Sequence, residues 1–160
     1  DGRYYDKIAD ELDALHAKGP DVGAASAAVA ARALSHVLKA CYDQKLTHNQ
    51  IAHMKLGELM CYAETAAAFC REAAKDTLSE AVLFDKETWR AMSRVHAGHA
   101  ASWIASEGLS LVASCSDVDA VGLVDGLNMK AVAKAQKGAI ADMDLVARKL
   151  PEVFKAEQAV

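Results

Sequence analysis

The run from Thr47 to Thr77 constrains the fold most strongly, because it contains no proline and repeats apolar residues with a helical period. At about 100° per residue, one broad face carries Leu56, Leu59, Met60, Ala63, Ala66, Ala67, Cys70, Ala73 and Ala74. Glu58 and Glu72 lie on the opposite side. Thr47 and Gln50 have the spacing of a capping box, which predicts that the helix begins there. We therefore expect this run to be a central amphipathic helix against which the other segments pack.

The composition favours helix along most of the chain. Only two of the 160 residues are proline, alanine is abundant, and β-branched residues are too sparse to build a sheet. A hydrophobic fraction of 52% with a net charge of −4 is typical of a folded globular domain. The mildly acidic balance lacks the basic surface that nucleic-acid binding requires. We predict an all-α fold that does not bind nucleic acid.

Helix start and stop signals divide the rest of the chain into further helices. Asp21, Asp85 and Asn128 are each placed to cap a helix, and Pro151 follows the last periodic residue. The expected helices are Arg3–Ala17, which is short, and three long ones at 21–43, 85–115 and 128–150, with a short helix or turn at 116–126. The last long helix would turn inward Met129, Val132, Gln136, Ala139, Ile140, Met143, Val146 and Leu150. With the central run, these segments predict a single domain over residues 1–160, an up-and-down bundle of four long helices plus a short N-terminal helix.

The first residue, the lack of targeting segments and the cysteines indicate the origin and the cellular location of the chain. The first residue is Asp1 rather than methionine, so we expect the chain to be the C-terminal part of a larger protein. The sequence has neither a signal peptide nor a run of about 18 apolar residues, so no transmembrane segment is expected. The cysteines fall inside helical patterns and form no C-x-x-C pair: Cys41, Cys61, Cys70 and Cys115. We expect reduced core thiols and a cytoplasmic location.

The third long helix carries the residues nearest to a metal motif. His96 and His99 are three positions apart on one face, between Trp89 and Trp103, so the two imidazoles are weak candidates for metal ligands. A di-iron bundle, however, needs Glu-x-x-His on two helices, and the sequence contains no Glu-x-x-His. Core or interface histidines are the favoured interpretation, with a metal or small cofactor bound between these four rings as the alternative.

Other polar and aromatic residues indicate contacts rather than chemistry. Glu58, Glu64 and Glu107 are candidate buried bases, but the better interpretation is a solvated carboxylate or one paired with Arg71 or Arg94. The basic face of the last helix is expected to be solvated; it consists of Lys130, Lys134 and Lys137. Four large rings are expected at an interface: Tyr62, Phe69, Trp89 and Trp103. For Tyr62 and Phe69 the alternative is that a neighbouring helix of the same bundle covers them. We expect no catalytic, cofactor-binding or metal residue in this chain.

Two of the helical segments resemble a known family. The segment HNQIAHMKLGELMCYAETA resembles a helix in the C-terminal bundles of acyl-CoA dehydrogenases, above all the extra helical domain of the long forms. The segment MSRVHAGHAASWIASEGLSLV is similar to another helix of that family, in which an alanine pair precedes a small–acidic–glycine–leucine turn. Here these are Ala100 and Ala101, followed by the residues Ser106, Glu107, Gly108 and Leu109. The resemblance extends from Thr47 to Val112, and more loosely over the rest.

The resemblance implies a flavoprotein parent. Such a protein uses FAD to remove hydrogens across the α,β bond of an acyl-CoA and passes electrons to an electron-transfer flavoprotein. The chain lacks the Tyr-Glu-Gly-Thr loop that carries the catalytic base in many members, so no catalytic residue is carried over. For this chain the resemblance therefore implies a non-catalytic appended bundle that helps the oligomer, a partner or a membrane surface meet the enzyme. The expected partners are a second copy or the rest of the flavoprotein. The alternatives are a free-standing four-helix bundle with a metal or small cofactor, and an all-α adaptor.

Overall fold

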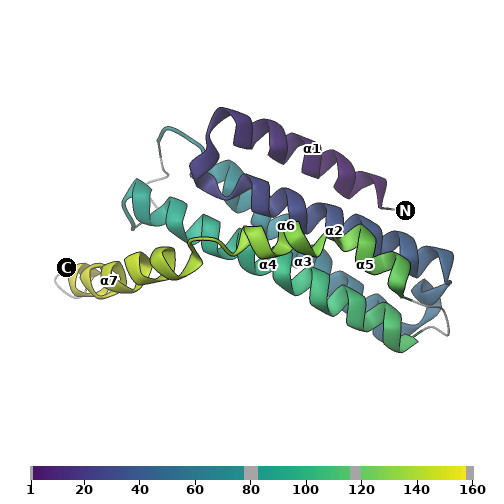
Figure 1. Cartoon of the computed structure of the whole chain (residues 1–160). Helices are drawn as coiled ribbons and strands as arrows, with labels where there is room; N and C mark the ends of the chain where they lie inside the picture. Colours follow the sequence, from purple (N-terminus) through teal and green to yellow (C-terminus); the bar gives the residue numbers. More distant parts are fainter. Residues whose placement is uncertain (1, 78–82, 116–119, 158–160) are drawn as a thin grey trace.

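The computed structural model describes residues 2–77, 83–115 and 120–157, and within these residues all regular structure is helical (Figure 1). The all-α prediction is confirmed. The elements are α1 (Arg3–Lys18), α2 (Ala24–Asp43), α3 (Gln50–Ala73), α4 (Lys86–Cys115), α5 (Val121–Leu127), α6 (Met129–Ala135) and α7 (Ala139–Glu157), with 3-10 turns at Pro20–Val22 and Leu46–His48. Over the described residues, no helix has both the length and the apolar character needed to cross a bilayer.

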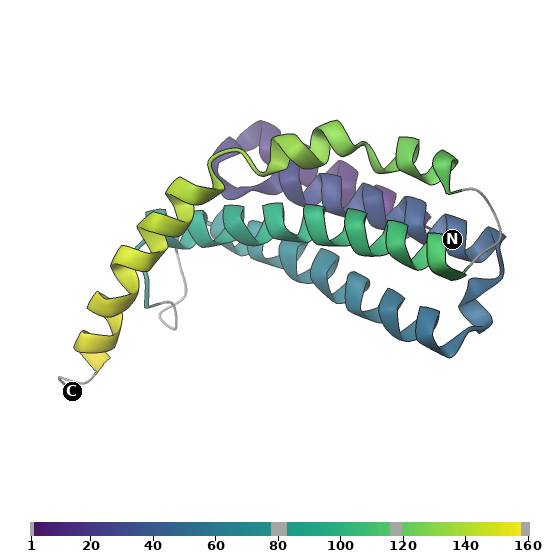
Figure 2. The same cartoon turned by 60° about the horizontal axis from the view of Figure 1, so that its bottom comes forward.

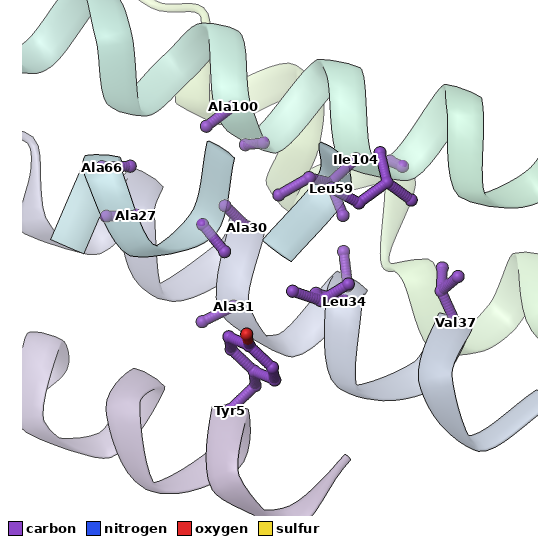
Figure 3. Close-up of a cluster of buried hydrophobic side chains, with 14 of the residues drawn as sticks. Tyr5, Ala27, Ala30, Ala31, Leu34, Val37, Leu59, Ala66, Ala100 and Ile104 are labelled. Atoms are coloured by element: carbon purple, nitrogen blue, oxygen red, sulfur yellow. The ribbon is translucent and has the colours of Figure 1, made fainter. Parts of the chain in front are cut away.

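Helix α2, not α3, occupies the centre of the molecule. It packs against α1, α3, α4, α5 and α6, and Figure 3 shows it between Tyr5 of α1 and Ile104 of α4. Its buried residues are mostly small: Ala24, Ala27, Ala28, Ala30, Ala31, Ala33, Leu34, Ser35, Val37 and Cys41. The prediction that the run from Thr47 to Thr77 is central is therefore wrong. Because α2 has few long polar side chains, it can be covered on several sides, whereas α3 keeps one face in water.

One glycine shows how closely the helices approach α2. A Cβ atom added to Gly108 of α4 would lie 2.3 Å from Cγ2 of Val37. The Val37 side chain is fully buried, and because it is β-branched and lies in a helix it strongly prefers one χ1 rotamer. Glycine at this position therefore lets α4 and α2 pack at short range.

Two of the predicted helix caps are confirmed. The Asp85 carboxylate accepts a hydrogen bond from the Thr88 N–H at 2.8 Å, at the start of α4. The Asn128 side chain accepts one from the Ala131 N–H at 3.2 Å, at the start of α6. In both cases the side chain satisfies a backbone donor that has no partner within its helix.

The predicted cap at Thr47 is wrong. Asn49 caps α3 instead, because its side-chain oxygen accepts from Ile51 N at 2.9 Å and Ala52 N at 3.2 Å. Thr47 lies in a 3-10 turn that positions the chain before the helix. The helix also ends at Ala73, before the predicted end at Thr77.

The predicted cap at Asp21 is also wrong. Helix α2 begins after Gly23, whose φ of +80° requires the left-handed region that glycine favours. Asp21 lies one turn earlier and forms an ion pair with Arg90 of α4. The carboxylate is thus used between elements rather than at the helix start.

The predicted helix from Asn128 to Leu150 is divided in two. Gly138 has a φ of +87°, and α6 ends before it while α7 begins after it. Helix α7 then continues through Pro151 to Glu157. Pro151 is exposed, so water can bind the carbonyl that loses its helical partner. The fourth long helix of the predicted bundle is therefore replaced by two helices with different directions.

Helix α7 leaves the body of the molecule. It packs mainly on α4 and projects past the end at which α4 begins (Figures 1 and 2). The face predicted to point inward is largely in water, since Ile140 is 73% exposed and Met143 is 46% exposed. That prediction is wrong because it assumed a straight helix along the bundle. Of the predicted inward face, only Val132 of α6 is buried.

Two glycine substitutions test the short distance between α2 and α4. Gly108→Ala should lower the free energy of unfolding by about 1–3 kcal/mol, because the added methyl overpacks Val37. Gly57→Ala in α3 is the matched control, since its Cβ would meet nothing within 4 Å. That variant should gain about 0.5–1 kcal/mol from better helix propensity. Urea unfolding of both variants measures the difference, and equal effects would contradict the packing.

Candidate functional site

An apolar groove opens where α7 diverges from α3 and α4. It has a volume of about 600 Å³. Its lining residues are Thr65 and Phe69 from α3, Met92, Val95, His96 and His99 from α4, and Met143, Val146, Ala147 and Leu150 from α7. Such a size is within the range of ligand sites in proteins, and the lining is apolar apart from Thr65 and the two histidines.

A row of aromatic and imidazole rings forms the α3–α4 wall beside the groove. Phe69 lies 4.6 Å from Trp89 and 6.2 Å from His96, measured between ring centroids. Tyr62 lies 6.4 Å from His96, 5.7 Å from His99 and 6.0 Å from Trp103. The structure therefore brings Tyr62 and Phe69 of α3 against the stripe predicted on α4, and their role at an interface stays a prediction. The rings cover one another in part, so that Tyr62 and Phe69 are half-buried.

The hydrogen bond between Thr65 and His96 fixes which imidazole nitrogen carries the proton. The Thr65 hydroxyl lies 2.7 Å from the Cys61 carbonyl oxygen, which can only accept, so the hydroxyl donates its proton there. Its oxygen then accepts from Nε2–H of His96, 3.1 Å away. Burial, and then the neighbouring His99, lower the pKa of His96 below its ordinary value of 6.5. His96 is therefore held neutral in the groove wall at pH 7.

The metal-binding alternative finds little support in this geometry. The Nε2–H of His96 is used by Thr65, which leaves only Nδ1 with a free lone pair. In the part of the chain that the structure describes, no group of three or more His, Cys, Asp or Glu residues could hold a metal ion. His96 and His99 thus share a wall of the groove without a third ligand among those residues.

Glu58 and Glu107 pair with Lys55, not with the predicted Arg71 or Arg94. The Lys55 ammonium lies 3.0 Å from Glu58 and 2.7 Å from Glu107. Trp103 Nε1 donates to Glu58 at 3.3 Å, and the ammonium lies 5.5 Å from the centroid of the Trp103 ring. The hydrogen bond from Lys55 lowers the pKa of Glu58. A general base needs the opposite shift, so this network indicates structural ion pairs.

Glu64 lies beside Tyr5, and Arg71 and Arg94 pair with carboxylates other than the predicted ones. Burial, followed by the adjacent Glu64, raises the pKa of Tyr5 in α1 to about 12. Arg71 pairs with Glu11 of α1 at 3.0 Å. These contacts attach α1 to α3 at the surface, and they involve no nucleophile.

Arg94 anchors the start of α7. Its guanidinium makes two hydrogen bonds to the Asp142 carboxylate, at 2.9 and 2.5 Å, and a third to the Asp21 carbonyl oxygen at 2.5 Å. Such a bidentate pair fixes direction as well as distance. One turn away on α4, Gly98 accepts a hydrogen bond at 2.7 Å from the Gln136 side chain, which holds the end of α6. These bonds set the angle at which α7 departs and thus the width of the groove.

The basic residues and cysteines take no part in the groove. Lys130, Lys134 and Lys137 are all exposed, as predicted. Cys41 and Cys70 are buried, and burial raises the pKa of each thiol to about 11, which keeps it protonated and unreactive. Cys61 is exposed, so the prediction of a core thiol is wrong there, because the residue lies on the outer face of α3.

The groove itself is not predictable from helical periodicity. The periodic pattern identifies the rings of α3 and α4, but it places Met143, Val146 and Leu150 inside the bundle. The available signal is Gly138, which interrupts the last helical pattern and permits a change of direction. Comparison with protein families, with curated proteins and with solved structures finds no match for this chain.

The histidine in the groove wall predicts a dependence of stability on pH. Because the pKa of His96 is lower in the folded protein, the unfolded chain binds more protons as the pH falls below about 6.5. The free energy of unfolding should therefore be highest above that pH and should decrease as the pH falls through the folded pKa. Urea unfolding at pH 7.5 and 5.5 measures this loss.

His96→Gln should reduce the loss of unfolding free energy between pH 7.5 and 5.5. The matched control is His53→Gln, at an exposed histidine of α3 away from the groove, and it should retain the loss of the unmodified chain. An unchanged loss in His96→Gln would show that the groove histidine is not its source.

Proposed function

We propose that this chain is a non-catalytic interaction domain that binds an amphipathic helix in the groove between α3, α4 and α7. The carrying observation is the groove itself, about 600 Å³ of apolar space open to water at the end of the molecule. Large apolar surfaces exposed on a folded domain commonly mark contact sites, and an apolar groove accepts the apolar face of a helix.

The chemistry around the groove supports binding rather than catalysis. Glu58 and Glu107 are ion-paired with Lys55, and His96 is neutral with its N–H bound to Thr65. The Thr65 hydroxyl beside His96 donates its proton to the Cys61 carbonyl oxygen, so His96 is not placed to activate it. The bundle of four long helices expected from the sequence would be completed if a helix of another chain filled the groove.

We also propose that the parent is an acyl-CoA dehydrogenase-like flavoprotein that binds FAD, and that this chain is its C-terminal helical domain. The support is the resemblance of the segments now placed in α3 and α4. The four cysteines are free, which supports a reducing compartment, and we propose the cytoplasm.

Photo-crosslinking from the groove wall tests the interaction function. A benzophenone amino acid is introduced at His99, an exposed ring position of the lining, and at Ala113 of the same helix as a control outside the groove. After irradiation of the intact protein, mass spectrometry identifies the residues joined to each site. We expect His99 to join a helix of another polypeptide chain and Ala113 to give little product. Crosslinks from His99 only within its own chain would contradict the proposal.

The chain should not dehydrogenate an acyl-CoA. We expect no reduction of an artificial electron acceptor when the purified chain is mixed with FAD and palmitoyl-CoA, because no carboxylate that could serve as the base is among the residues lining the groove. The assay follows the acceptor's absorbance against a buffer control. Turnover that follows the protein through purification would overturn the non-catalytic assignment.

A further inference from the structure

The apolar stripe of α7 indicates which helix fills the groove. Ile140, Met143, Ala147, Leu150 and Phe154 recur at spacings of three and four residues, the pattern of a helix that packs along another helix. Leu150 is 37% exposed and Phe154 is 58% exposed, although both are large apolar residues. The same stripe lines the groove through Met143, Ala147 and Leu150. A single helix thus carries both a wall of the groove and a surface of the kind that the groove would bind.

The charges beside the stripe favour an antiparallel pair of α7 helices. Asp144 and Arg148 are both exposed on one flank, the acid toward the start of α7 and the base toward its end. In a parallel pair each would face its own copy, and like charges would repel. In an antiparallel pair Asp144 faces the partner's Arg148. The other flank takes no part, because Asp142 is bound to Arg94 and Lys149 to Glu152.

The apolar residues match one residue away from that register, so Asp144 lies about 1.5 Å along the helix axis from the level of the partner's Arg148, within reach of an arginine side chain. When the two-fold axis passes between Val146 and Ala147, Met143 lies opposite the partner's Leu150 and Val146 lies opposite the partner's Ala147. The large side chains then meet at the two ends of the contact, and the smallest one lies near the axis. Two helices can approach closely where alanine lies at their crossing point.

We propose that this protein self-associates through α7, which pairs antiparallel with α7 of a second copy at the mouth of the groove. This inference rests on the proposed function, because it names the partner of the same groove. The contact is isologous, as in most protein dimers. A single helix pair is smaller than the roughly 1,200–2,000 Å² of stable interfaces, so the dissociation constant should be on the order of 10 µM.

Sedimentation velocity of the intact chain, from about 1 to 200 µM around the expected dissociation constant, measures the association. Leu150→Glu should raise the dissociation constant by about tenfold or more, because two carboxylates enter an apolar contact. Tyr42→Glu is the matched control, since Tyr42 is 64% exposed at the end of α2 and should not affect association. Circular dichroism verifies that both variants keep their helix content. A chain that stays monomeric at every concentration overturns the inference.

A charge exchange tests the antiparallel direction without changing the apolar contact. Asp144→Arg should weaken association by about three- to tenfold, because two ion pairs become repulsive. The double variant Asp144→Arg with Arg148→Asp should restore it, since both pairs are re-formed with reversed signs. A double variant as weak as the single one overturns the proposed direction.

Disulfide trapping tests the register. In a background of Cys61→Ser and Cys115→Ser, Ala147→Cys should form a covalent dimer under mild oxidation, because the two residues lie beside the axis. Ala141→Cys, at an exposed alanine of the same helix, should not, since its copies would be well over 7 Å apart. No trapping at Ala147, or equal trapping at both positions, overturns the register.

The two proposals fail in different ways. A monomeric chain in which His99 still joins another polypeptide leaves the interaction domain in place and overturns only self-association. A chain that is monomeric and shows no intermolecular product from His99 overturns both. A product joining His99 to the partner's α7 supports both.

Discussion

Close packing around α2 is the constraint on which the rest of the structure depends. A helix can be covered on several sides only if few of its side chains are polar, and the run of buried alanines in α2 also lets its neighbours come close. The neighbouring helix α4 contributes Gly108 at the point of contact with Val37, where a single methyl would overlap. Because dispersion and burial act over such short distances, each element around α2 has one position that fits. The arrangement of α1, α3, α4 and the α5–α6 segment follows from this packing.

A second, polar constraint directs the C-terminal part of the chain. Gln136 binds the Gly98 carbonyl oxygen, Gly138 bends the chain between α6 and α7, and Asp142 binds Arg94. These three features lie within two turns of sequence, so α7 starts at a fixed angle to α4 and leaves the body of the molecule. The groove is the consequence, because α7 covers the rings of α3 and α4 only in part. A function in binding thus depends on a few hydrogen bonds at one hinge rather than on the core.

The groove wall combines aromatic rings with a neutral histidine, and the carboxylates near it are ion-paired. Burial favours the neutral form of His96, and Thr65 fixes its N–H, so the wall presents no charge from this residue at neutral pH. Further along α3, Lys55 forms ion pairs with both Glu58 and Glu107 beside Trp103. An apolar wall with its neighbouring charges paired is suited to contact with another apolar surface. The proposed pairing of α7 with a second copy would use this property and would place Asp144 and Arg148 at the rim, where water remains.

The amino-acid sequence by itself determined that the fold is all-α, the approximate bounds of most helices and two of the helix caps. Periodicity along the chain is enough for these, and Asp85 and Asn128 act through backbone groups within three residues. It also indicated an interface role for Tyr62, Phe69, Trp89 and Trp103, whereas the contacts among these rings are found only in the structure. The Asn49 cap of α3 is also local and was missed in favour of Thr47. Tertiary structure alone decided that α2 is central and that Met143 and Leu150 face a groove. Those outcomes depend on contacts between residues far apart in sequence, such as Arg94 with Asp142, and on Gly138, whose effect on direction no periodic pattern records.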